Sequence, residues 1–566
     1  MALIHTLTQV IQEAVSSAGI EAEVAPVQAT KDPSHGDYQW NGAFRLAKAA
    51  RKPPRAVAEE VNGALASHPA IASSEVAGPG FINLFVADAF LGESLVRQLE
   101  SERLGASERQ GCVVIDYSSP NVAKRMHVGH LRSTVIGAAL DRMHRFAGHR
   151  VIADNHIGDW GTQFGKLIVA WDSWVDEAAF EADPIGELER IYVKFSQEAS
   201  DELQDRARAE TAKLQAGDER NRALWERFIE ASMKEFDGLY ERLGISFDVT
   251  YGESHYDAEL QPLVEQLLAD GVAEHSKGAV VIPFTKADGK GLGDQPMLIR
   301  KADGAALYGT TDLATVRLRM REWEPVEVIY VTDTRQQHHF RQLFAACKKL
   351  GWVGEGVLQH IWFGLLSLPE GAMSSRQGNV IRLKDLLDEA TRRARAVVDE
   401  KSAHLPDEER AAIAEAVGCG AVRYADLSQN PQSNVTFEWD KMISLEGNTA
   451  PFLMYSLARC RSIQNKGGLA RELQTFTPVH PLERELTTML LRFPEAFEVA
   501  LGAYRPNMLC DYLFGLAKTL NRFYAEVRVL GSEGDELRCR ATLIEATSRT
   551  LETGLGLLGI EALERM

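Results

Sequence analysis

Apolar positions in the first part of the chain predict a small domain of helices and strands. The opening segment MALIHTLTQVIQEAV repeats apolar residues at helical spacing and lacks the cationic start and cleavage site of a signal peptide. A stretch punctuated by glycine and proline follows and ends in GPGFINLFV, where Phe81, Ile82, Leu84 and Phe85 have the composition of a strand. We therefore expect a small α+β domain over residues 1–108.

A strand–helix–strand pattern begins at about residue 110. An apolar run at 113–115 has the composition of a buried strand, and a polar loop, DYSSPNVAKRMHVGH, follows it. A helix ending at Gly148 should come next, because apolar residues recur at i, i+3 and i+4: Leu131, Val135, Ala138, Ala139, Met143 and Phe146. A second apolar run at 151–153 completes one βαβ unit of a parallel nucleotide-binding sheet. The polar loop should therefore lie at the carboxyl end of that sheet, where ligands bind.

The rest of the chain predicts a helical insertion, further strands and a helical end. Residues 175–243 are charged, helical in pattern and poor in glycine, whereas MLIRK, VEVIYVTD and HIWFGLL have the composition of strands with helices between them. After Trp439, leucine-rich helical patterns continue to the last residue. We therefore predict a multidomain α/β fold: a split Rossmann-type parallel-sheet domain over 109–438 with a helical insertion at about 175–243, and an all-α domain over 439–566.

Composition and charge narrow the class of protein. The chain is 45% hydrophobic and 25% charged, as in globular proteins, and no apolar run is long enough to predict a transmembrane helix. The net charge of −18 argues against a protein that coats nucleic acid nonspecifically, but residues 440–566 carry 15 Lys/Arg against 16 Asp/Glu and would repel a polyanion least. One face of a predicted helix in the N-terminal part is basic and carries Arg45, Lys48, Arg51 and Lys52. This face is either a solvated surface or a phosphate-contacting patch. Six dispersed cysteines without a CxxC pair favour reduced thiols in a cytoplasmic protein, without a structural metal.

The polar loop contains two histidines at the start of the predicted helix. His127 and His130 flank Gly129, and a helix N-terminus presents free N–H groups that suit phosphate. Imidazoles at this place can hydrogen-bond phosphates and stabilise the charge that develops during attack on phosphorus, while Gly129 leaves room for an adenine base. Two alternatives stay open, namely a zinc site for which no third ligand is evident nearby, and two solvated histidines without a function.

A second polar loop lies in GAMSSRQGNVIRLKDLL, between a predicted strand and a predicted helix. Met373, Ser374, Ser375 and Arg376 form a small, flexible segment that can close on phosphates through side chains and backbone N–H groups. Taken alone, it could equally be a surface turn.

Together the two loops resemble the HIGH and KMSKS motifs of class I aminoacyl-tRNA synthetases, in the order that this family has. The segments SSPNVAKRMHVGHLRSTVIG, DNHIGDWGTQFG, FDVTYGESHYD, LYGTTDLA and EGNTAPFLMY resemble arginyl-tRNA synthetases in particular, as do GDYQWNGAFRLAK and GLGLLGIEALERM near the two ends. The resemblance therefore covers essentially the whole chain. It implies an arginine–tRNA ligase that activates L-arginine with Mg²⁺-ATP to arginyl-adenylate and transfers arginine to the 3′-terminal ribose of its tRNA.

The resemblance also implies roles for individual residues. Catalysis would involve His127, His130, Lys124 and Arg376, and ATP would be bound by His127, Gly129, His130, Lys124, Met373, Ser374, Ser375 and Arg376. Arginine would be bound by Glu253 and Asp312 facing its guanidinium, joined by Tyr308, and by Asn121 and Gln336 at its amino and carboxylate end. The chemistry agrees, because a guanidinium offers five donors and no acceptor and needs carboxylates in matched geometry. Without the resemblance, Glu253 could be a helix cap and Asp312 a solvated surface residue.

The second loop departs from the usual motif. Ala372 stands where the motif begins with lysine, and Arg376 replaces its second lysine. Many arginyl-tRNA synthetases are similar in lacking the first lysine, and Lys124 occupies the position thought to compensate. We therefore predict that Lys124 donates to the ATP phosphates.

The partners implied by the resemblance are L-arginine, ATP and arginine tRNA, with the tRNA elbow at residues 1–108, the acceptor end at the catalytic domain and the anticodon at residues 439–566. Four aromatic residues could stack on unpaired bases or pack in a core: Phe452, Tyr455, Tyr512 and Tyr524. The resemblance further implies a monomer, no membrane partner, and activation that needs bound tRNA.

Two rival functions stay open. One is a nucleotidyltransferase for smaller substrates, which the large helical C-terminal domain disfavours. The other is a catalytically silent tRNA-binding homologue, which the intact histidines and carboxylates disfavour. A cysteine-specific synthetase would want a zinc site that the sequence does not offer.

Overall fold

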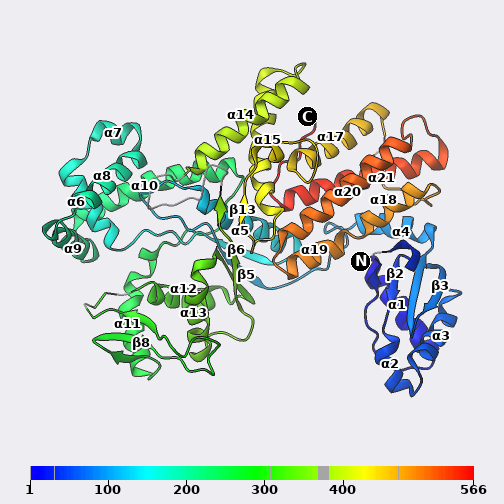
Figure 1. Cartoon of the computed structure of the whole chain (residues 1–566), viewed down its shortest axis with the longest axis horizontal. Helices are drawn as coiled ribbons and strands as arrows, with labels where there is room; N and C mark the ends of the chain where they lie inside the picture. Colours follow the sequence, from blue (N-terminus) through cyan, green and yellow to red (C-terminus); the bar gives the residue numbers. More distant parts are fainter. Residues whose placement is uncertain (1, 31, 303, 306, 368–380, 470) are drawn as a thin grey trace. The chain divides into compact units, whose positions relative to one another are not determined.

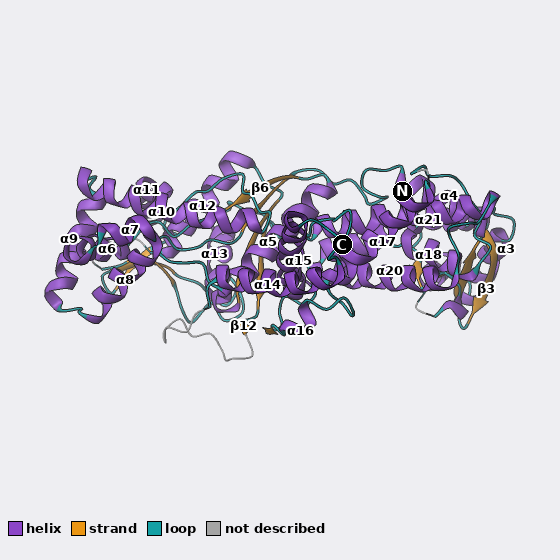
Figure 2. Ribbon diagram, turned by 90° about the horizontal axis from the view of Figure 1, so that it is seen from above, coloured by secondary structure: helices purple, strands orange, loops and turns teal. Residues whose placement is uncertain are grey.

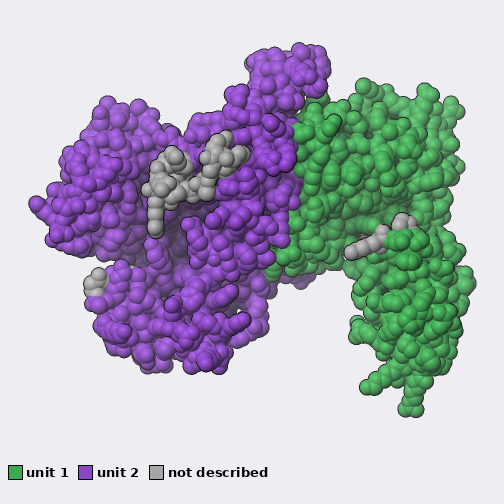
Figure 3. Space-filling view, in the orientation of Figure 1, with its two compact units in different colours: residues 1–109, 444–557, 561–566 green, residues 110–443, 558–560 purple. Residues whose placement is uncertain are grey.

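The computed structural model describes residues 2–30, 32–302, 304–305, 307–367, 381–469 and 471–566 (Figure 1). These residues form two compact units (Figure 3). Unit 1 contains 1–109, 444–557 and 561–566, and unit 2 contains 110–443 and 558–560. Helices make up most of both units, as the colouring by secondary structure in Figure 2 shows.

The predicted parallel sheet lies in unit 2 and has the strand order β11-β10-β5-β6. Its strands are β5 (Cys112–Asp116), β6 (Arg150–Asp154), β10 (Glu327–Asp333) and β11 (Leu358–Phe363), and every neighbouring pair is parallel. Helix α5 (Val128–Ala147) connects β5 to β6, so the predicted strand–helix–strand unit is confirmed. The chain later returns to β10 on the opposite side of β5. The carboxyl ends of β5 and β10 therefore meet at a topological switch point, where ligands of such sheets bind.

A group of helices follows β6 and has its own apolar core. Its members are α6 (Thr162–Trp174), α7 (Glu177–Ala182), α8 (Pro184–Gln197), α9 (Asp201–Gln215) and α10 (Glu219–Arg242). Phe164, Trp171, Phe195 and Phe228 are buried in this core. Most charged residues of these helices are exposed, as expected for an amphipathic bundle, whereas Glu187 is buried and pairs with Arg190.

One predicted strand belongs to a different sheet. The prediction that MLIRK resumes the parallel β/α alternation was wrong, because β9 (Met297–Arg300) pairs antiparallel with β8 (Ala279–Ile282), which pairs antiparallel with β7 (Glu274–Ser276). Burial alternates along β9: Met297 and Ile299 are buried while Leu298 is 41% exposed. Such alternation is typical of an antiparallel sheet with one solvated face, whereas strands buried on both faces lack it.

The remaining helices of unit 2 lie before, between and after the strands β7 to β11 along the chain. They are η2 (Glu253–Tyr256), α11 (Asp257–Ala269), α12 (Tyr308–Trp323), η3 (Thr334–Gln336), α13 (Gln337–Lys349), α14 (Leu383–Lys401), α15 (Asp407–Leu427) and α16 (Trp439–Met442), with the short parallel pair β12 (Leu366–Ser367) and β13 (Val435–Thr436). Residues 558–560 join this unit through Arg423 of α15, whose buried Nη1 donates to the Gly559 carbonyl at 2.7 Å.

Unit 1 combines the predicted α+β part with the predicted helical end of the chain. A four-stranded antiparallel sheet has the order β1-β2-β4-β3 and consists of β1 (Gln28–Ala29), β2 (Tyr38–Trp40), β4 (Phe81–Val86) and β3 (Ile71–Ala77). The segment FINLFV forms β4, as predicted. The accompanying helices are α1 (Leu3–Ser17), η1 (Pro33–His35), α2 (Ala43–Ala50), α3 (Pro54–Leu65), α4 (Asp88–Leu99), α17 (Ala450–Gly467), α18 (Pro481–Leu491), α19 (Phe493–Gly502), α20 (Pro506–Glu526) and α21 (Gly534–Leu557).

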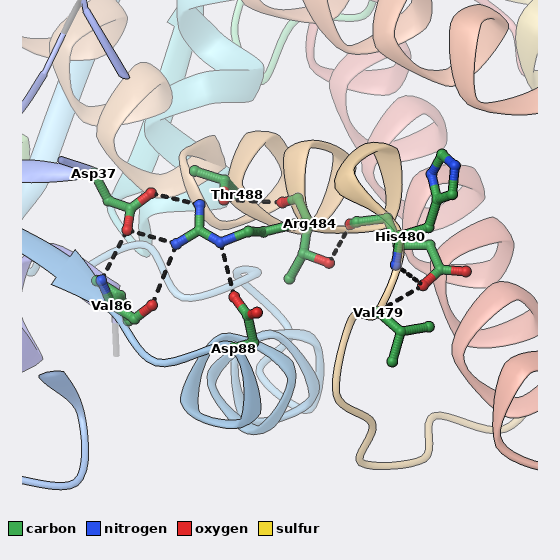
Figure 4. Close-up of polar contacts among 9 residues, drawn as sticks. Asp37, Val86, Asp88, Val479, His480, Arg484 and Thr488 are labelled. Atoms are coloured by element: carbon green, nitrogen blue, oxygen red, sulfur yellow. Dashed lines mark hydrogen bonds and ion pairs between the residues drawn. The ribbon is translucent and has the colours of Figure 1, made fainter. Parts of the chain in front are cut away.

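Arg484 on α18 joins the helical end of the chain to the N-terminal sheet (Figure 4). Its guanidinium binds Asp37 through two hydrogen bonds of 2.9 and 2.8 Å, Asp88 at 2.7 Å and the Val86 carbonyl at 3.2 Å. Asp37 is 8% exposed and also accepts the Val86 N–H at 2.8 Å. Bidentate pairing of this kind is the strongest form of an ion pair at a partly buried place. Arg484 thus links α18 to the sheet, while the Tyr38 hydroxyl of β2 donates to Glu495 of α19 at 2.8 Å.

Replacing Arg484 by methionine should loosen the end of β4. The change leaves the buried Asp37 carboxylate without its cation, at a cost of about 2–3 kcal/mol. We expect faster hydrogen–deuterium exchange at β2 and β4, measured by mass spectrometry of peptic peptides.

The matched control is Arg522→Met, which breaks an ion pair with Glu485 whose two side chains are 54% and 46% exposed. Exposed pairs contribute little, so this variant should exchange like the parent chain. Equal exchange in both variants would contradict the role of Arg484.

Candidate active site

The loop between β5 and α5 is held in an unusual backbone conformation. Ser118, Ser119 and Ala123 have positive φ angles of 73°, 50° and 60°. Non-glycine residues adopt this region only where the surroundings enforce it. Asn155, after β6, accepts the Ser119 N–H at 3.1 Å, and Ser232 of α10 accepts the Ala123 N–H at 2.9 Å. The sheet and the inserted helices therefore fix the loop from two sides.

The two predicted histidines cap the N-terminus of α5 together. His127 Nδ1 accepts the Gly129 N–H at 3.0 Å, and His130 Nδ1 accepts the His127 N–H at 3.1 Å. Burial lowers the pKa of His127, and burial lowers that of His130 to about 3, with further lowering by neighbouring positive charge in both cases. Both rings are therefore neutral at physiological pH. Because each Nδ1 accepts, each ring carries its proton on Nε2 and can donate it to a bound oxyanion.

Two cations face this pair of imidazoles. The positive charges of Lys124 and Arg335 both contribute to the lowered pKa of His127. Lys124 is exposed, with its ammonium 5.3 Å from the centre of the Tyr192 ring. Arg335 follows β10, is 77% exposed and pairs with Asp333 at 2.5 Å. Arg335 was not predicted from the sequence, although its place directly after VEVIYVTD, at the carboxyl end of a predicted strand, was a usable signal.

The chain returns to this loop just before α14. The Val128 N–H donates to the Ile381 carbonyl at 3.1 Å, and the Leu383 N–H donates to the Met126 carbonyl at 2.9 Å. Backbone of the second polar segment is thus paired with backbone of the first. The predicted residues Met373, Ser374, Ser375 and Arg376 lie outside the described residues.

Two of the predicted arginine-binding residues form an acidic site. Burial raises the pKa of the Glu253 carboxyl to about 7, and the negative charges of Asp312 and Asp159 add to this effect while His156 opposes it. Glu253 and Asp312 therefore lie within electrostatic reach of each other in a poorly solvated place. Two carboxylates that repel each other in this way are stabilised by a shared cation.

Asp159 in the segment DNHIGDWG fixes the position of Glu253. Its carboxylate accepts the Ser254 N–H at 2.8 Å and the Ser254 hydroxyl at 2.6 Å, while the Glu253 N–H donates to the Ile157 carbonyl at 3.1 Å. A Cβ atom on Gly252 would lie 2.2 Å from Asp159, so only glycine fits before Glu253. No role for Asp159 was predicted from the sequence.

A buried guanidinium ties α12 to the sheet. Arg319 is fully buried, and its Nη2 lies 2.6 Å from carboxylate oxygens of both Asp116, at the end of β5, and Asp154, at the end of β6. Arg319 lies seven positions after Asp312 on the same helix, which places both on one face. This network was not predicted, because an arginine on a helix is solvated by default and only tertiary structure reveals its partners.

The three remaining predicted residues lie on three different segments of unit 2. Asn121 forms a parallel bridge with Gly158 in the segment that carries Asp159. Tyr308 begins α12 one turn before Asp312 and is 75% exposed, and Gln336 is exposed at the end of η3. The structure thus brings His127 and His130 together with Lys124, and Glu253 with Asp312.

The aromatic residues of the C-terminal helices divide into two kinds. Tyr455 and Tyr524 are 41% and 45% exposed and flank the Arg459 guanidinium, which lies 4.9 and 5.3 Å from their ring centres. Tyr512 is buried and Phe452 packs edge-on against Phe514. An exposed tyrosine–arginine–tyrosine stack resembles the surfaces on which unpaired bases stack.

Comparison with models of protein families shows to which family the chain belongs. The catalytic domain of class I tRNA synthetases (R) matches residues 94–439, the DALR anticodon binding domain matches 453–566, and the arginyl tRNA synthetase N terminal domain matches 5–86. The chain belongs to the arginyl-tRNA synthetase family.

Relatives of this arginyl-tRNA synthetase chain match over its full length. It is 45% identical to the arginine–tRNA ligase of Fusobacterium nucleatum and 40% identical to that of Shigella sonnei, with 99% of each chain covered. Among solved structures, the arginyl-tRNA synthetases of Thermus thermophilus (27% identity, 100% of both chains) and Plasmodium falciparum (25%, 100% and 99%) each superpose with a TM-score of 0.84. The predicted family and fold class are thereby confirmed.

The described residues lack two further features. Within the described ranges, no group of three or more His, Cys, Asp or Glu side chains is arranged to hold a metal ion. Of the helices that the structure describes, none is long and apolar enough to cross a membrane.

Proposed function

We propose that the site at the carboxyl end of the sheet ligates L-arginine to its tRNA. Full-length relatives at 45% and 40% identity are arginine–tRNA ligases, which supports this activity for the chain. The observation that carries the amino-acid specificity is the carboxylate pair. Glu253 and Asp312 offer acceptors for the donors of a guanidinium, and citrulline would leave one carboxylate without a cation.

The first step joins arginine to the nucleotide. The carboxylate of arginine attacks the α-phosphorus of Mg²⁺-ATP, the bond to the β-phosphate bridging oxygen breaks, and pyrophosphate leaves. The Nε2–H groups of His127 and His130, at the N-terminus of α5, donate to the phosphate oxygens on which charge develops. A neutral imidazole that carries its proton on Nε2 can donate this hydrogen bond. The protein therefore acts by positioning and charge stabilisation, and no covalent enzyme intermediate is needed.

The second step uses the same site. The 2′-hydroxyl of the terminal ribose attacks the carbonyl carbon of arginyl-adenylate, AMP leaves, and the hydroxyl proton goes to solvent. Asn121 and Gln336 hold the amino and carboxylate end of arginine, and Tyr308 hydrogen-bonds the guanidinium. In the first step, the ATP phosphates are also bound by Met373, Ser374, Ser375 and Arg376.

Different parts of the chain bind different parts of the tRNA. Residues 1–108 bind the elbow, unit 2 binds the acceptor end, and the C-terminal helices bind the anticodon. The matches to the N-terminal and DALR domains support this division, and the exposed Tyr455–Arg459–Tyr524 stack supports base contacts on α17 and α20. The chain acts as a monomer in the cytoplasm, and bound tRNA is required for the first step.

A smaller-substrate nucleotidyltransferase on the same fold is disfavoured by the matches at 5–86 and 453–566, because such an enzyme has no use for an anticodon-binding domain.

Pyrophosphate exchange into ATP, measured with each standard amino acid, tests the function. We expect exchange with arginine alone and only when total tRNA is present. Exchange with another amino acid would show that the carboxylate pair is misassigned, and exchange without tRNA would remove the tRNA requirement. No exchange by folded protein would favour a silent tRNA-binding homologue.

Arginine affinity should depend on pH through Glu253. In the free protein, burial raises the pKa of the Glu253 carboxyl to about 7, and a bound guanidinium favours the ionised form of this carboxyl. Binding below pH 7 must therefore release a proton, so the association constant should rise with pH and level off above about pH 8. Calorimetry at about pH 6 in buffers of different ionisation enthalpy measures the released proton.

The Glu253→Gln variant should bind weakly and lose the component of the pH dependence centred near 7. The matched control is Glu265→Gln, an exposed carboxylate on α11, which should keep the full pH dependence. Proton release that persists unchanged in Glu253→Gln would refute the assignment.

Lys124→Ala tests the predicted replacement for the missing lysine. Removing a charge-assisted contact to phosphate should weaken ATP binding about 10- to 100-fold and lower turnover, with arginine affinity unchanged. Lys194→Ala is the matched control, because Lys194 likewise lies over an aromatic ring, 5.1 Å from the centre of Trp174. If ATP affinity and turnover in Lys124→Ala equal those of the control, the idea is wrong.

A further inference from the structure

We propose that His339 is a positioning residue that sets the orientation of the Asp312 carboxylate for the guanidinium of arginine. The inference rests on the proposed function, because it takes Asp312 as a ligand of the substrate.

The contact between the two side chains is direct. His339 Nε2 lies 2.5 Å from Asp312 Oδ2 and joins the first turn of α13 to α12. Both side chains are mostly buried, with 29% and 22% of their surfaces exposed. A hydrogen bond to Oδ2 fixes the plane of the carboxylate and leaves Oδ1 to receive a donor from the substrate. His339 therefore decides which oxygen of Asp312 is presented.

Packing fixes the imidazole in turn. The ring of His339 lies edge-on against Phe340, with centres 5.4 Å apart, and Phe340 lies 4.4 Å from His360. His360 Nε2 is 2.8 Å from the Thr332 hydroxyl at the carboxyl end of β10. The position of His339 thus follows from two strands of the parallel sheet and does not depend on Asp312 alone.

The charges around the pair favour a proton on His339. Burial lowers its pKa, but the hydrogen bond and the negative charge of Asp312 outweigh this and raise the pKa overall. Burial lowers the pKa of the neighbouring His360 to about 4, and the positive charge of His339 adds to this lowering. Because an ionised carboxylate only accepts hydrogen bonds, His339 Nε2 is the donor towards Asp312 both in its charged form and in its neutral form with the proton on Nε2.

A donor in this position matters for specificity. Glu253 and Asp312 repel each other electrostatically, so an unrestrained Asp312 side chain would turn away towards solvent. Second-layer hydrogen bonds that orient a ligand-binding carboxylate raise affinity without touching the ligand, as they do around metal sites. The loss of His339 should therefore weaken arginine binding and leave ATP binding intact.

The experiment compares the full-length His339→Leu and His339→Gln variants by calorimetric titration with L-arginine and, separately, with Mg²⁺-ATP. Leucine removes the donor, whereas glutamine keeps an N–H at about the place of Nε2. We expect arginine affinity to fall about 10- to 100-fold in His339→Leu and to return to within about 5-fold of the parent in His339→Gln, with unchanged ATP affinity. His338→Leu, which alters the exposed neighbouring histidine, is the matched control and should bind both ligands normally.

Three results would overturn the inference: unchanged arginine affinity in His339→Leu, equal losses for arginine and ATP, or a glutamine variant as weak as the leucine variant. The Asp312→Asn background distinguishes a failure of the His339 role from a failure of the arginine site. There, the added His339→Leu change should have no further effect on arginine affinity, and an additive effect would contradict action through Asp312. If Asp312→Asn alone binds arginine normally, the assignment of the arginine site fails, and the role of His339 fails with it.

Discussion

The arrangement of the active site depends on one buried ion network. Arg319 comes from α12, and its two carboxylate partners end β5 and β6, so a single guanidinium fixes a helix against two strands. Removing the charges of Arg319, Asp116 and Asp154 from water has a large free-energy cost. The short contacts between the guanidinium and both carboxylates offset this cost. The loops that carry His127 and Asp159 leave from these same strand ends, while Asp312 lies two turns before Arg319. The loop of His127, the segment of Asp159 and the helix of Asp312 are thereby attached to one point in the core.

The inserted helices complete this arrangement. The strained loop of Ser118, Ser119 and Ala123 is stable only because several groups accept its N–H donors, and Ser232 of α10 is one of them. Arg125 in the same loop binds Asp183 and, through its backbone, Glu189 at 2.8 Å, both from the region of α8. The insertion is therefore a support for the histidines as much as a separate helical layer. Strain held by such surroundings is typical of loops that must present side chains to a ligand.

The sequence allowed much of this to be predicted, for identifiable reasons. The βαβ unit around His127 was predictable because apolar periodicity and the cap at Gly148 are local properties. The β9 strand was assigned to the wrong sheet, because a run of four residues does not reveal whether its neighbours are parallel. His339, Arg335 and Arg319 were missed, since each acquires its role from residues that are distant along the chain. The roles of Glu253 and Asp312 came from the family resemblance, as an acidic residue alone predicts only a solvated surface.

The tie through Arg484 has a consequence for the order in which the chain matures on the ribosome. The partners Asp88 and Asp37 are synthesised 396 and 447 residues before Arg484, a delay of roughly 20 to 90 s at usual translation rates. Unit 2 is likewise incomplete until Gly559 can meet Arg423. Neither unit can therefore reach its final packing while the nascent chain is still growing.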